Sequence, residues 1–384
     1  MSALTWPTLV PLASLAAWLW LLLARGFFWR TDVRLPPGAE RAPADGVWPS
    51  VTVVVPARDE AEVLPVSLPS LLAQDYPGRL EILLVDDGST DGTGALGREL
   101  AERAPGGPEL SVLSPGEPEP GWTGKLWAVR HGVERARSEG TEPDFLLLTD
   151  ADIAHAPGTL RRLVCAALAA DLDLVSQMAR LRVTTGWERM IVPAFVYFFA
   201  KLFPFRWVNR PSGRTAAAAG GCALLRTGAV VRAGLPDSIR DAVIDDVTLG
   251  RAVKRSGGRI WLGLADGISS VRPYAGLRPL WRMVARSAYA QLGNNPLMLV
   301  GTVLGLGLVY LVPPVWSVAG SPVGGAAWLV MTLSFVPMLR YYRQPLWLAP
   351  LLPVTAALYL AMTVESAVRH HRGEGAAWKG RTYS

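Results

Sequence analysis

The stretch Leu80-Glu-Ile-Leu-Leu-Val-Asp86-Asp87-Gly88-Ser89 decides the fold class, because an apolar run ends there in two acidic residues and a turn. A second stretch, Phe145-Leu-Leu-Leu-Thr149-Asp150-Ala151-Asp152, repeats this arrangement. Continuous apolar runs are typical of parallel strands buried on both faces. The carboxyl ends of such strands face the crevice in which open α/β sheets bind ligands. We therefore predict an α/β domain with a mostly parallel sheet and an acidic crevice.

The acidic residues also indicate what the crevice binds. A third pair, Asp245-Asp246, follows the second stretch. Several carboxylates in one crevice repel one another unless they share a cation or a proton. A divalent metal that holds a phosphorylated ligand is the simplest resolution, and oxygen ligands of this kind suit Mg²⁺ or Mn²⁺.

Further strands and helices alternate along the middle of the chain. Short apolar runs predict strands at 51–55, 110–113, 172–178 and 259–264. Apolar residues at helical spacing predict helices at 61–74, 127–137, 157–170 and 280–292. Strands that alternate with helices at this spacing indicate βαβ units.

The two ends of the chain are too apolar for an ordinary soluble enzyme. The 384 residues are 50% hydrophobic and their mean hydropathy is +0.25. Residues 9–28 carry one charge, Arg25, and are long enough to cross a hydrocarbon core of about 30 Å. A cleaved signal peptide is the alternative, but the run is long and lacks a basic start. Three further candidate spans lie at 296–318, 323–339 and 346–364.

This pattern divides the chain into five parts. We expect a membrane anchor at 1–30, a linker at 31–49, an α/β domain at 50–292, about three membrane helices at 293–366 and a basic tail at 367–384. The segment 191–208 is rich in aromatic residues and is bracketed by Pro193 and Pro204, which suits an interfacial helix in the headgroup region. A buried core helix is the alternative.

The charge distribution predicts the topology. Arg25, Arg30 and Arg34 follow the first span, which places its C-terminal side and the α/β domain in the cytoplasm of a multi-pass inner-membrane protein. Arg369 and Arg372 disagree, because three further crossings would put the tail outside. Either one C-terminal run does not cross or the rule fails here. The net charge of +6 needs no nucleic-acid partner, since a membrane surface explains it.

Two cysteines, Cys165 and Cys222, are few enough to indicate a reduced compartment without structural disulfides. The ordinary interpretation of both is a free, buried thiol.

Each candidate site residue has a functional and a structural interpretation. Asp86 and Asp87 accept hydrogen bonds from a nucleotide, or they cap the following helix. Lys125, in Gly121-Trp-Thr-Gly-Lys, neutralises phosphate, or it is an exposed loop lysine. Asp245 and Asp246 begin a helix, where one of them is a general base or both are caps.

Arg282 and Arg286 lie one helical turn apart. They grip a pyrophosphate leaving group, or they belong to a cationic helix at the membrane surface.

Together the motifs resemble family 2 glycosyltransferases. The matching pieces are V-V-V-P-A-R-D-E (53–60), L-V-D-D-G-S-T-D-G-T (84–93), G-K (124–125), T-D-A-D (149–152), G-G-C (220–222) and I-D-D-V-T-L-G (244–250). The chain looks closest to the bacterial hopene-associated branch, which is membrane-bound. That likeness rests on G-W-T-G-K-L-W-A (121–128), P-A-F-V-Y-F-F (193–199), F-R-W-V-N-R-P (205–211), A-A-A-A-G-G-C (216–222) and A-R-S-A-Y-A-Q-L (285–292).

The resemblance implies a GT-A fold, a nucleotide-sugar donor, a divalent metal (Mn²⁺ or Mg²⁺) and a lipid acceptor. It implies that Asp246 is the catalytic base, with Asp245 beside it. Asp152, with Asp150, would bind the metal. The donor would contact Pro56, Arg58, Glu60, Asp86, Asp87, Lys125, Asp150 and Arg286. Gly220, Gly221 and Cys222 would line the acceptor side.

The chain departs from the family in two places. It has Asp245-Asp246 where many relatives have Glu-Asp. The late Q/R-x-x-R-W motif of processive enzymes is reduced to Met283-Val-Ala-Arg286-Ser287, which keeps only the arginine. This argues against a polysaccharide synthase and leaves the role of Arg286 open.

Two other functions compete with the transferase. A strand that ends in Asp-x-Asp also marks haloacid-dehalogenase-like phosphatases, with Asp150 as nucleophile, but that pattern does not explain Asp86-Asp87. A non-catalytic membrane scaffold that binds nucleotide sugars would not need the intact acids.

Overall fold

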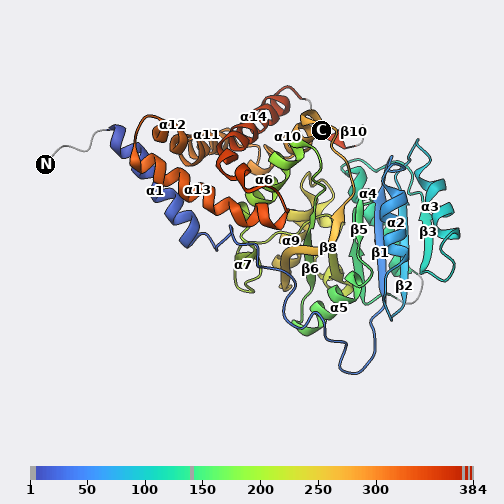
Figure 1. Cartoon of the computed structure of the whole chain (residues 1–384). Coiled ribbons are helices and arrows are strands. Elements are labelled where there is room, and N and C mark those ends of the chain that lie inside the picture. Colours follow the sequence, from blue (N-terminus) through green and yellow to red (C-terminus); the bar gives the residue numbers. More distant parts are fainter. Residues whose placement is uncertain (1–5, 139–141, 374–376, 379–380, 383–384) are drawn as a thin grey trace.

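The computed structural model describes residues 6–138, 142–373, 377–378 and 381–382. An eight-stranded sheet with helices on both faces fills one end of the molecule, and apolar helices fill the other (Figure 1). The α/β class and the mostly parallel sheet are therefore confirmed.

The sheet is parallel except around two short strands. Its order is β3-β2-β1-β4-β7-β6-β8-β5. The strands are β1 (Val51–Ala57), β2 (Leu80–Asp86), β3 (Glu109–Leu113), β4 (Phe145–Leu148), β5 (Ile153–His155), β6 (Leu174–Arg180), β7 (Ala223–Arg226) and β8 (Ile260–Ser270). β7 is antiparallel to β4 and β6, and β5 is antiparallel to β8. The sequence predicts the other six strands but not β5, which has three residues, or β7, a four-residue strand that ends in Arg226.

Alternate residues of each central strand enter opposite cores, as the pleat of a strand requires. On one face Val54 and Leu83 pack with residues of α4 (Gly124–Ser138) and α9 (Asp245–Arg255). On the other face Val53 and Val55 pack with residues of α2, α3 and α5. Those helices span Leu64–Leu72, Thr93–Glu102 and Thr159–Ala169. Burial of each such aliphatic side chain stabilises the fold by about 1.5–3 kcal/mol.

Shorter elements connect these layers. They are α7 (Phe205–Val208), α8 (Thr227–Arg232), α10 (Leu277–Ala285) and 3₁₀ turns at Asp237–Ile239 and Ala290–Leu292. Near the C-terminal end, β9 (Ala377–Trp378) pairs antiparallel with β10 (Arg381–Thr382). The helix predicted at 280–292 therefore begins earlier and ends at Ala285, before the second of these 3₁₀ turns.

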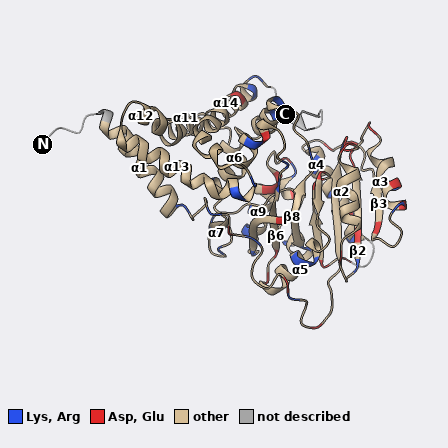
Figure 2. Ribbon diagram, in the orientation of Figure 1, with Lys and Arg blue, Asp and Glu red and all other residues tan. Residues whose placement is uncertain are grey.

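The apolar helices begin and end the described chain. They are α1 (Trp6–Ala24), α11 (Pro296–Leu306) with a π-helical turn (Gly307–Leu311) and α12 (Val312–Val318), α13 (Pro322–Tyr341), and α14 (Leu352–His371) after a 3₁₀ turn (Leu346–Leu351). Within the described residues, four segments are long and apolar enough to cross a membrane: Gly186–Val208, Pro296–Val318, Pro322–Tyr341 and Leu346–His371. Charged residues are nearly absent from α1, α11, α12 and α13 (Figure 2).

The aromatic segment forms α6 (Gly186–Leu202), followed by α7. Ile191, Val196 and Tyr197 are fully buried, and the Tyr197 hydroxyl hydrogen-bonds Ser334 of α13 at 2.7 Å. Tyr359 of α14 donates to the Ile191 carbonyl at 3.1 Å. The structure thus favours the buried-core interpretation for most of this helix, and the interfacial placement stays a prediction.

Candidate functional site

The acidic crevice lies at the carboxyl edge of the sheet, where the strand order reverses. β1 pairs with β2 on one side and with β4 on the other, so a crevice opens beyond the ends of β1 and β4. Antiparallel β7 begins at this edge, because Ala223 pairs with Leu148. Gly220, three residues before β7, therefore lies beside Asp150, two residues after β4.

Lys125 joins two of the predicted acids. Its Nζ lies 2.7 Å from Asp150 Oδ1 and 2.9 Å from Asp245 Oδ2. Gly220 lies against this pair, since a Cβ on it would be in ordinary van der Waals contact with Lys125 Nζ at 3.5 Å and Asp150 Oδ2 at 3.6 Å. The structure thus brings together Lys125, Asp150, Asp245 and Gly220 and excludes the exposed-loop interpretation of the lysine.

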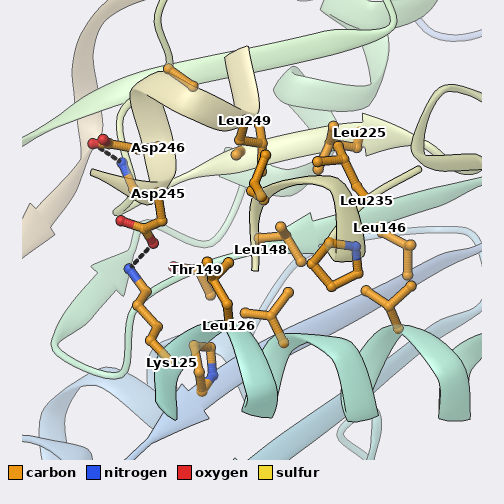
Figure 3. A pocket seen from close by; sticks show the side chains of 18 of the residues that line it. Lys125, Leu126, Leu146, Leu148, Thr149, Leu225, Leu235, Asp245, Asp246 and Leu249 are labelled. Atoms are coloured by element: carbon orange, nitrogen blue, oxygen red, sulfur yellow. Dashed lines mark hydrogen bonds and ion pairs between the residues drawn. The ribbon is translucent and has the colours of Figure 1, made fainter. Parts of the chain in front are cut away.

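Asp246 lies beside this cluster, at the start of α9 (Figure 3). Its carboxylate accepts hydrogen bonds from the backbone N–H of Gly220 at 3.1 Å and of Val247 at 2.7 Å. Burial and the charge of Asp245 nevertheless raise the pKa of Asp246 to about 6. A carboxylate with a pKa near working pH suits a general base.

The neighbouring groups respond differently. Burial disfavours the charged form of Asp245, but Lys125 outweighs it and lowers the pKa of Asp245. Burial, with the charges of Asp152 and Asp245, raises the pKa of Asp150 in spite of Lys125. Burial opposes the ammonium of Lys125, yet the two carboxylates raise the pKa of Lys125. Two adjacent aspartates therefore have opposite tendencies, and Asp246 is the one that holds a proton more readily.

Arg272 holds Asp152, although no sequence motif predicts it as a site residue. The Arg272 guanidinium donates to Asp152 at 3.0 Å and to both oxygens of Glu60 at 2.8 and 2.7 Å. Ser270 Oγ donates to Asp152 at 3.1 Å. β8 extends to Ser270, six residues beyond the predicted strand, and so carries Arg272 to the crevice. A prediction that extended this strand to residue 270 would have placed Arg272 at the crevice.

A buried histidine, His155, hydrogen-bonds Thr149, the residue that follows β4. Thr149 Oγ1 donates to the Gly221 carbonyl at 2.8 Å and lies 3.0 Å from His155 Nε2. Because the hydroxyl has one proton, His155 Nε2 is the donor to it. Burial lowers the pKa of His155 to about 4, so the ring is neutral near pH 7.

The loops after β1 and β2 interlock. Arg58 Nη1 donates to the Asp87 carbonyl at 2.5 Å and approaches the Asp87 carboxylate at 3.4 Å. Arg58 covers Asp87, whose side chain is fully buried. The predicted contact between Asp87 and a nucleotide is therefore not open in this structure. Asp86 is half-buried and accepts the Ser89 N–H at 2.9 Å, as in a turn. Pro56 lines the cavity described below.

The three residues predicted for the acceptor side have different surroundings in the structure. Gly220 faces the cluster, and Gly221 packs against Ile153, where a Cβ would lie 3.1 Å from Ile153 Cδ1. Cys222 is fully buried, and burial raises the pKa of its thiol to about 12. Its side chain therefore cannot line an acceptor surface, which corrects that prediction. Both cysteines are free and buried, as predicted.

Arg286 is exposed at the end of α10, and its charge lowers the pKa of Asp245. The structure therefore associates it with the acidic cluster.

A cavity of about 40 Å³ opens behind the cluster (Figure 3). Lys125, Asp245 and Asp246 form its polar end, and leucines of β4, α4 and α9 form the other. This volume holds about one or two water molecules. The crevice is therefore partly closed beneath its charged groups.

Asp150 and Asp152 fit a divalent metal bound together with phosphate. The described residues contain no group of three or more His, Cys, Asp or Glu side chains suited to a metal. Mg²⁺ bound beside phosphate oxygens needs only one or two carboxylates. Asp150 uses Oδ1 for Lys125, and Asp152 uses Oδ2 for Ser270 and Arg272, so each keeps one oxygen for a further ligand.

Comparison with known families identifies a domain within the chain. Residues 52–232 match the model of glycosyl transferase family 2. The mannosyltransferase PcManGT from Pyrobaculum calidifontis, solved in complex with GDP-Man and Mn²⁺, aligns with 93% of this chain and 98% of its own, at 21% identity and a TM-score of 0.58. The fold is therefore the GT-A type, as predicted. The family match over residues 52–232 includes Lys125 and Asp150 but ends before Asp246.

Three curated relatives share part of the chain. An N-acetylglucosaminyltransferase of Mesorhizobium japonicum is 31% identical over 137 residues, which are 35% of this chain and 30% of that protein. An undecaprenyl-phosphate mannosyltransferase of Micrococcus luteus is 34% identical over 33% of this chain and 48% of its own. A beta-monoglucosyldiacylglycerol synthase of a Synechocystis species is 33% identical over 30% and 22%. The chain thus spans less than half of each relative.

Proposed function

We propose that the chain is a membrane-bound inverting glycosyltransferase that transfers a sugar from a nucleoside diphosphate sugar to a lipid. The observation that carries the proposal is Asp246, a carboxylate with a raised pKa beside the Lys125 cluster at the carboxyl edge of a GT-A sheet. The family match over 52–232 supports the reaction class. A UDP-sugar is the first donor to test.

The crevice would bind the donor through its diphosphate. Lys125 and Arg286 would supply positive charge, and Gly220, which has no side chain, would let the diphosphate approach the backbone. A Mg²⁺ or Mn²⁺ ion held by Asp150 and Asp152 would neutralise charge on the departing nucleoside diphosphate. Arg272 and Ser270 orient the Asp152 carboxylate toward that role.

Asp246 would then act as the base. It takes the proton of the acceptor hydroxyl while the hydroxyl oxygen forms a bond to the anomeric carbon. The bond from that carbon to the diphosphate oxygen breaks, and both of its electrons leave with the nucleoside diphosphate. Displacement from the opposite face inverts the configuration. One carboxylate suffices because the leaving group needs no proton, unlike the two-carboxylate reaction of glycosidases.

The membrane helices support a lipid acceptor. The candidate spans lie next to the α/β domain, and a lipid hydroxyl would reach the crevice from the bilayer surface (Figure 2). Two of the relatives are named for lipid substrates or products. The hopene-associated branch that the sequence resembles makes a hopanoid the first acceptor to test. The catalytic domain would face the cytoplasm at the inner membrane.

The test is sugar transfer into lipid. Membranes that contain the chain are incubated with Mn²⁺ or Mg²⁺ and a panel of radiolabelled nucleotide sugars, and label is counted in the organic extract. We expect metal-dependent label in lipid that is absent in Asp246→Asn. Asp241→Asn, an exposed aspartate five residues earlier, is the matched control and should retain activity.

Other outcomes would identify the competing functions. Label in an aqueous polymer would indicate a polysaccharide synthase. A trapped aspartyl-phosphate on Asp150 would indicate the phosphatase. Donor binding without turnover, across a broad set of acceptors, would indicate a scaffold.

A further inference from the structure

A second, larger groove lies at the C-terminal end of α1. Its volume is about 850 Å³, and it shares no lining residue with the acidic cavity. Leu23 and Phe27, 70% and 41% exposed, form an apolar wall. Its lining also includes three arginines, two tryptophans and one aspartate: Arg34, Arg206, Arg210, Trp207, Trp261 and Asp32. The groove is thus apolar on the side of α1 and cationic on the side of the α/β domain.

The arginines of the groove have unused hydrogen-bonding capacity. Arg206 Nε and Arg34 Nη1 are buried without a hydrogen-bond partner, although each side chain has one acid: Asp32 at 2.5 Å and Asp266 at 3.1 Å. Arg210 is exposed and forms no ion pair with any residue that the structure describes. The Arg34 guanidinium also lies over the Tyr341 ring, 4.8 Å from its centroid, so Arg206 and Arg210 are the better placed to bind a ligand in the groove. Guanidinium groups match the oxygens of phosphate.

The aromatic residues fit the boundary between lipid and water. Trp207 stacks under Arg25, whose guanidinium carbon lies 4.9 Å from the ring centroid. Tryptophan is enriched at membrane interfaces, and arginine near helix ends reaches toward headgroups. α1 above the groove exposes Leu12, Leu19 and Trp20, as a helix in lipid does. Thr8–Ala24 of α1 is a shorter apolar helix than the four candidate spans. The groove lies at the depth of the headgroups if α1 forms the membrane anchor expected for residues 1–30.

We propose that this groove binds the phosphate headgroup of an anionic phospholipid, with the adjoining acyl chain against Leu23 and Phe27. Arg206 and Arg210 would hold the phosphate oxygens. Free phosphate shares that chemistry but has no use for the apolar wall. The proposal rests on the membrane anchoring proposed for α1 and assigns the groove no part in sugar transfer.

The groove is firmly attached to the strand that leads to the crevice. Trp261 Nε1 donates to the Arg34 carbonyl at 2.6 Å, and Leu264 N–H donates to the Val33 carbonyl at 2.9 Å. A Cβ on Gly263 would lie 2.3 Å from the Arg34 carbonyl, so residue 263 must stay small for this contact. A phospholipid in the groove would thus hold β8, and the domain built on it, at the membrane surface.

Lipid binding to the purified full chain tests the proposal. Native mass spectrometry in detergent would compare phosphatidylglycerol, phosphatidylcholine and inorganic phosphate as added ligands. We expect phosphatidylglycerol to bind best and Arg210→Gln to weaken it about tenfold, as loss of a charged hydrogen bond does. Arg340→Gln, which removes an exposed arginine outside the groove, should bind as the parent does.

A variant that is expected to bind lipid more tightly separates a loss of binding from a loss of folding. Asp32 is exposed, lies in the groove and pairs with Arg206, so Asp32→Asn removes negative charge and frees a guanidinium. We expect it to bind phosphatidylglycerol several-fold more tightly. Equal binding of the two lipids, equal effects of Arg210→Gln and Arg340→Gln, or competition by millimolar phosphate at full strength would overturn the proposal. Sugar transfer measured in the same preparations separates this result from the proposed function.

Discussion

At the scale of single residues, the site is set by the different protonation of two neighbouring aspartates. The pKa of Asp246 is raised to about 6, and the base must be ionised to act. We expect kcat/KM for sugar transfer to be constant above pH 6 and to fall about tenfold per pH unit below it. The measurement is a pH–rate profile at saturating metal, with protein integrity checked at each pH.

Asp245 should control the pH at which kcat/KM begins to fall. Its charge raises the pKa of Asp246, and it also occupies Lys125. Asp245→Asn removes the repulsion and frees the lysine, and both changes lower the pKa of Asp246. The acid limb of the profile should therefore move to lower pH, whatever the change in maximal rate. An acid limb that stays in place would contradict the assignment of Asp246 as its source.

Arg272 is expected to stabilise the crevice. It pairs with Glu60 and Asp152, whose side chains are 8% and 14% exposed. Arg272→Gln leaves both carboxylates without their cation and should lower the free energy of unfolding by about 2 kcal/mol. Arg272→Lys should give an intermediate loss, because an ammonium lacks the planar fork.

Denaturation in detergent measures these losses, with Arg259→Gln as the control. Arg259 lies just before the same strand, but its partner Asp171 is 78% exposed, so its loss should cost less than about 1 kcal/mol. Equal stability of the Arg272→Gln and Arg259→Gln proteins would show that the bridge contributes nothing.

Short motifs at the end of a strand and at the starts of two helices were enough to predict most of the site. Asp150, Asp245, Asp246 and Lys125 follow recognisable motifs, and the structure brings them together. Arg272 has no such motif, because its place depends on how far β8 extends. The burial of Asp87 and Cys222 depends on tertiary packing around Arg58 and β7, which no local pattern contains.

At the scale of elements, close backbone packing fixes the helix that carries the base. A Cβ on Gly250 of α9 would lie 2.6 Å from the carbonyl carbon of Ala217 and 2.8 Å from the nitrogen of Ala218. Gly250→Ala should therefore push α9 outward, cost about 1–3 kcal/mol of stability and reduce sugar transfer. Thermal unfolding and the transfer assay measure the two effects.

Gly301 of α11 provides the matched comparison. It is also a helical glycine, but a Cβ there has no neighbour within 4 Å. Gly301→Ala should stabilise the protein slightly, by up to about 1 kcal/mol, because alanine is the better helix former. A Gly250→Ala protein that behaves like Gly301→Ala would refute the packing argument.

The strands that are clearest in the sequence are those made of continuous apolar runs. β1, β2 and β4 are buried on both faces, so their composition alone reveals them. β5 and β7 are short, and antiparallel pairing with neighbours far along the chain stabilises them. The direction of β7 matters most, since it is what returns Gly220 to the crevice.

At the scale of the whole molecule, the course of the last helix suggests a topology that would remove a conflict in the charge pattern. Three crossings after the α/β domain would put Arg369 and Arg372 on the far side of the membrane. In the structure, the end of α14 lies beside the domain: Trp281 Nε1 of α10 donates to Glu365 at 2.5 Å, and the Tyr289 N–H donates to Ser366 at 3.1 Å. By contrast, the turn between α12 and α13 lies at the far end, near the start of α1 (Figure 1). The end of α14 therefore lies on the domain side, and we predict that α14 does not cross the membrane, although its length and composition would allow a crossing.

Cysteine labelling tests this topology directly. The two native cysteines are buried, so a single exposed cysteine reports its own side of the membrane. Ala319→Cys lies in the turn after α12, Arg372→Cys follows α14, and Ser114→Cys marks the α/β domain. In sealed, right-side-out vesicles, an impermeant maleimide should label Ala319→Cys and spare the other two until the membrane is opened. Labelling of Arg372→Cys together with Ala319→Cys would mean that α14 crosses, and the positive-inside pattern would then fail at the tail.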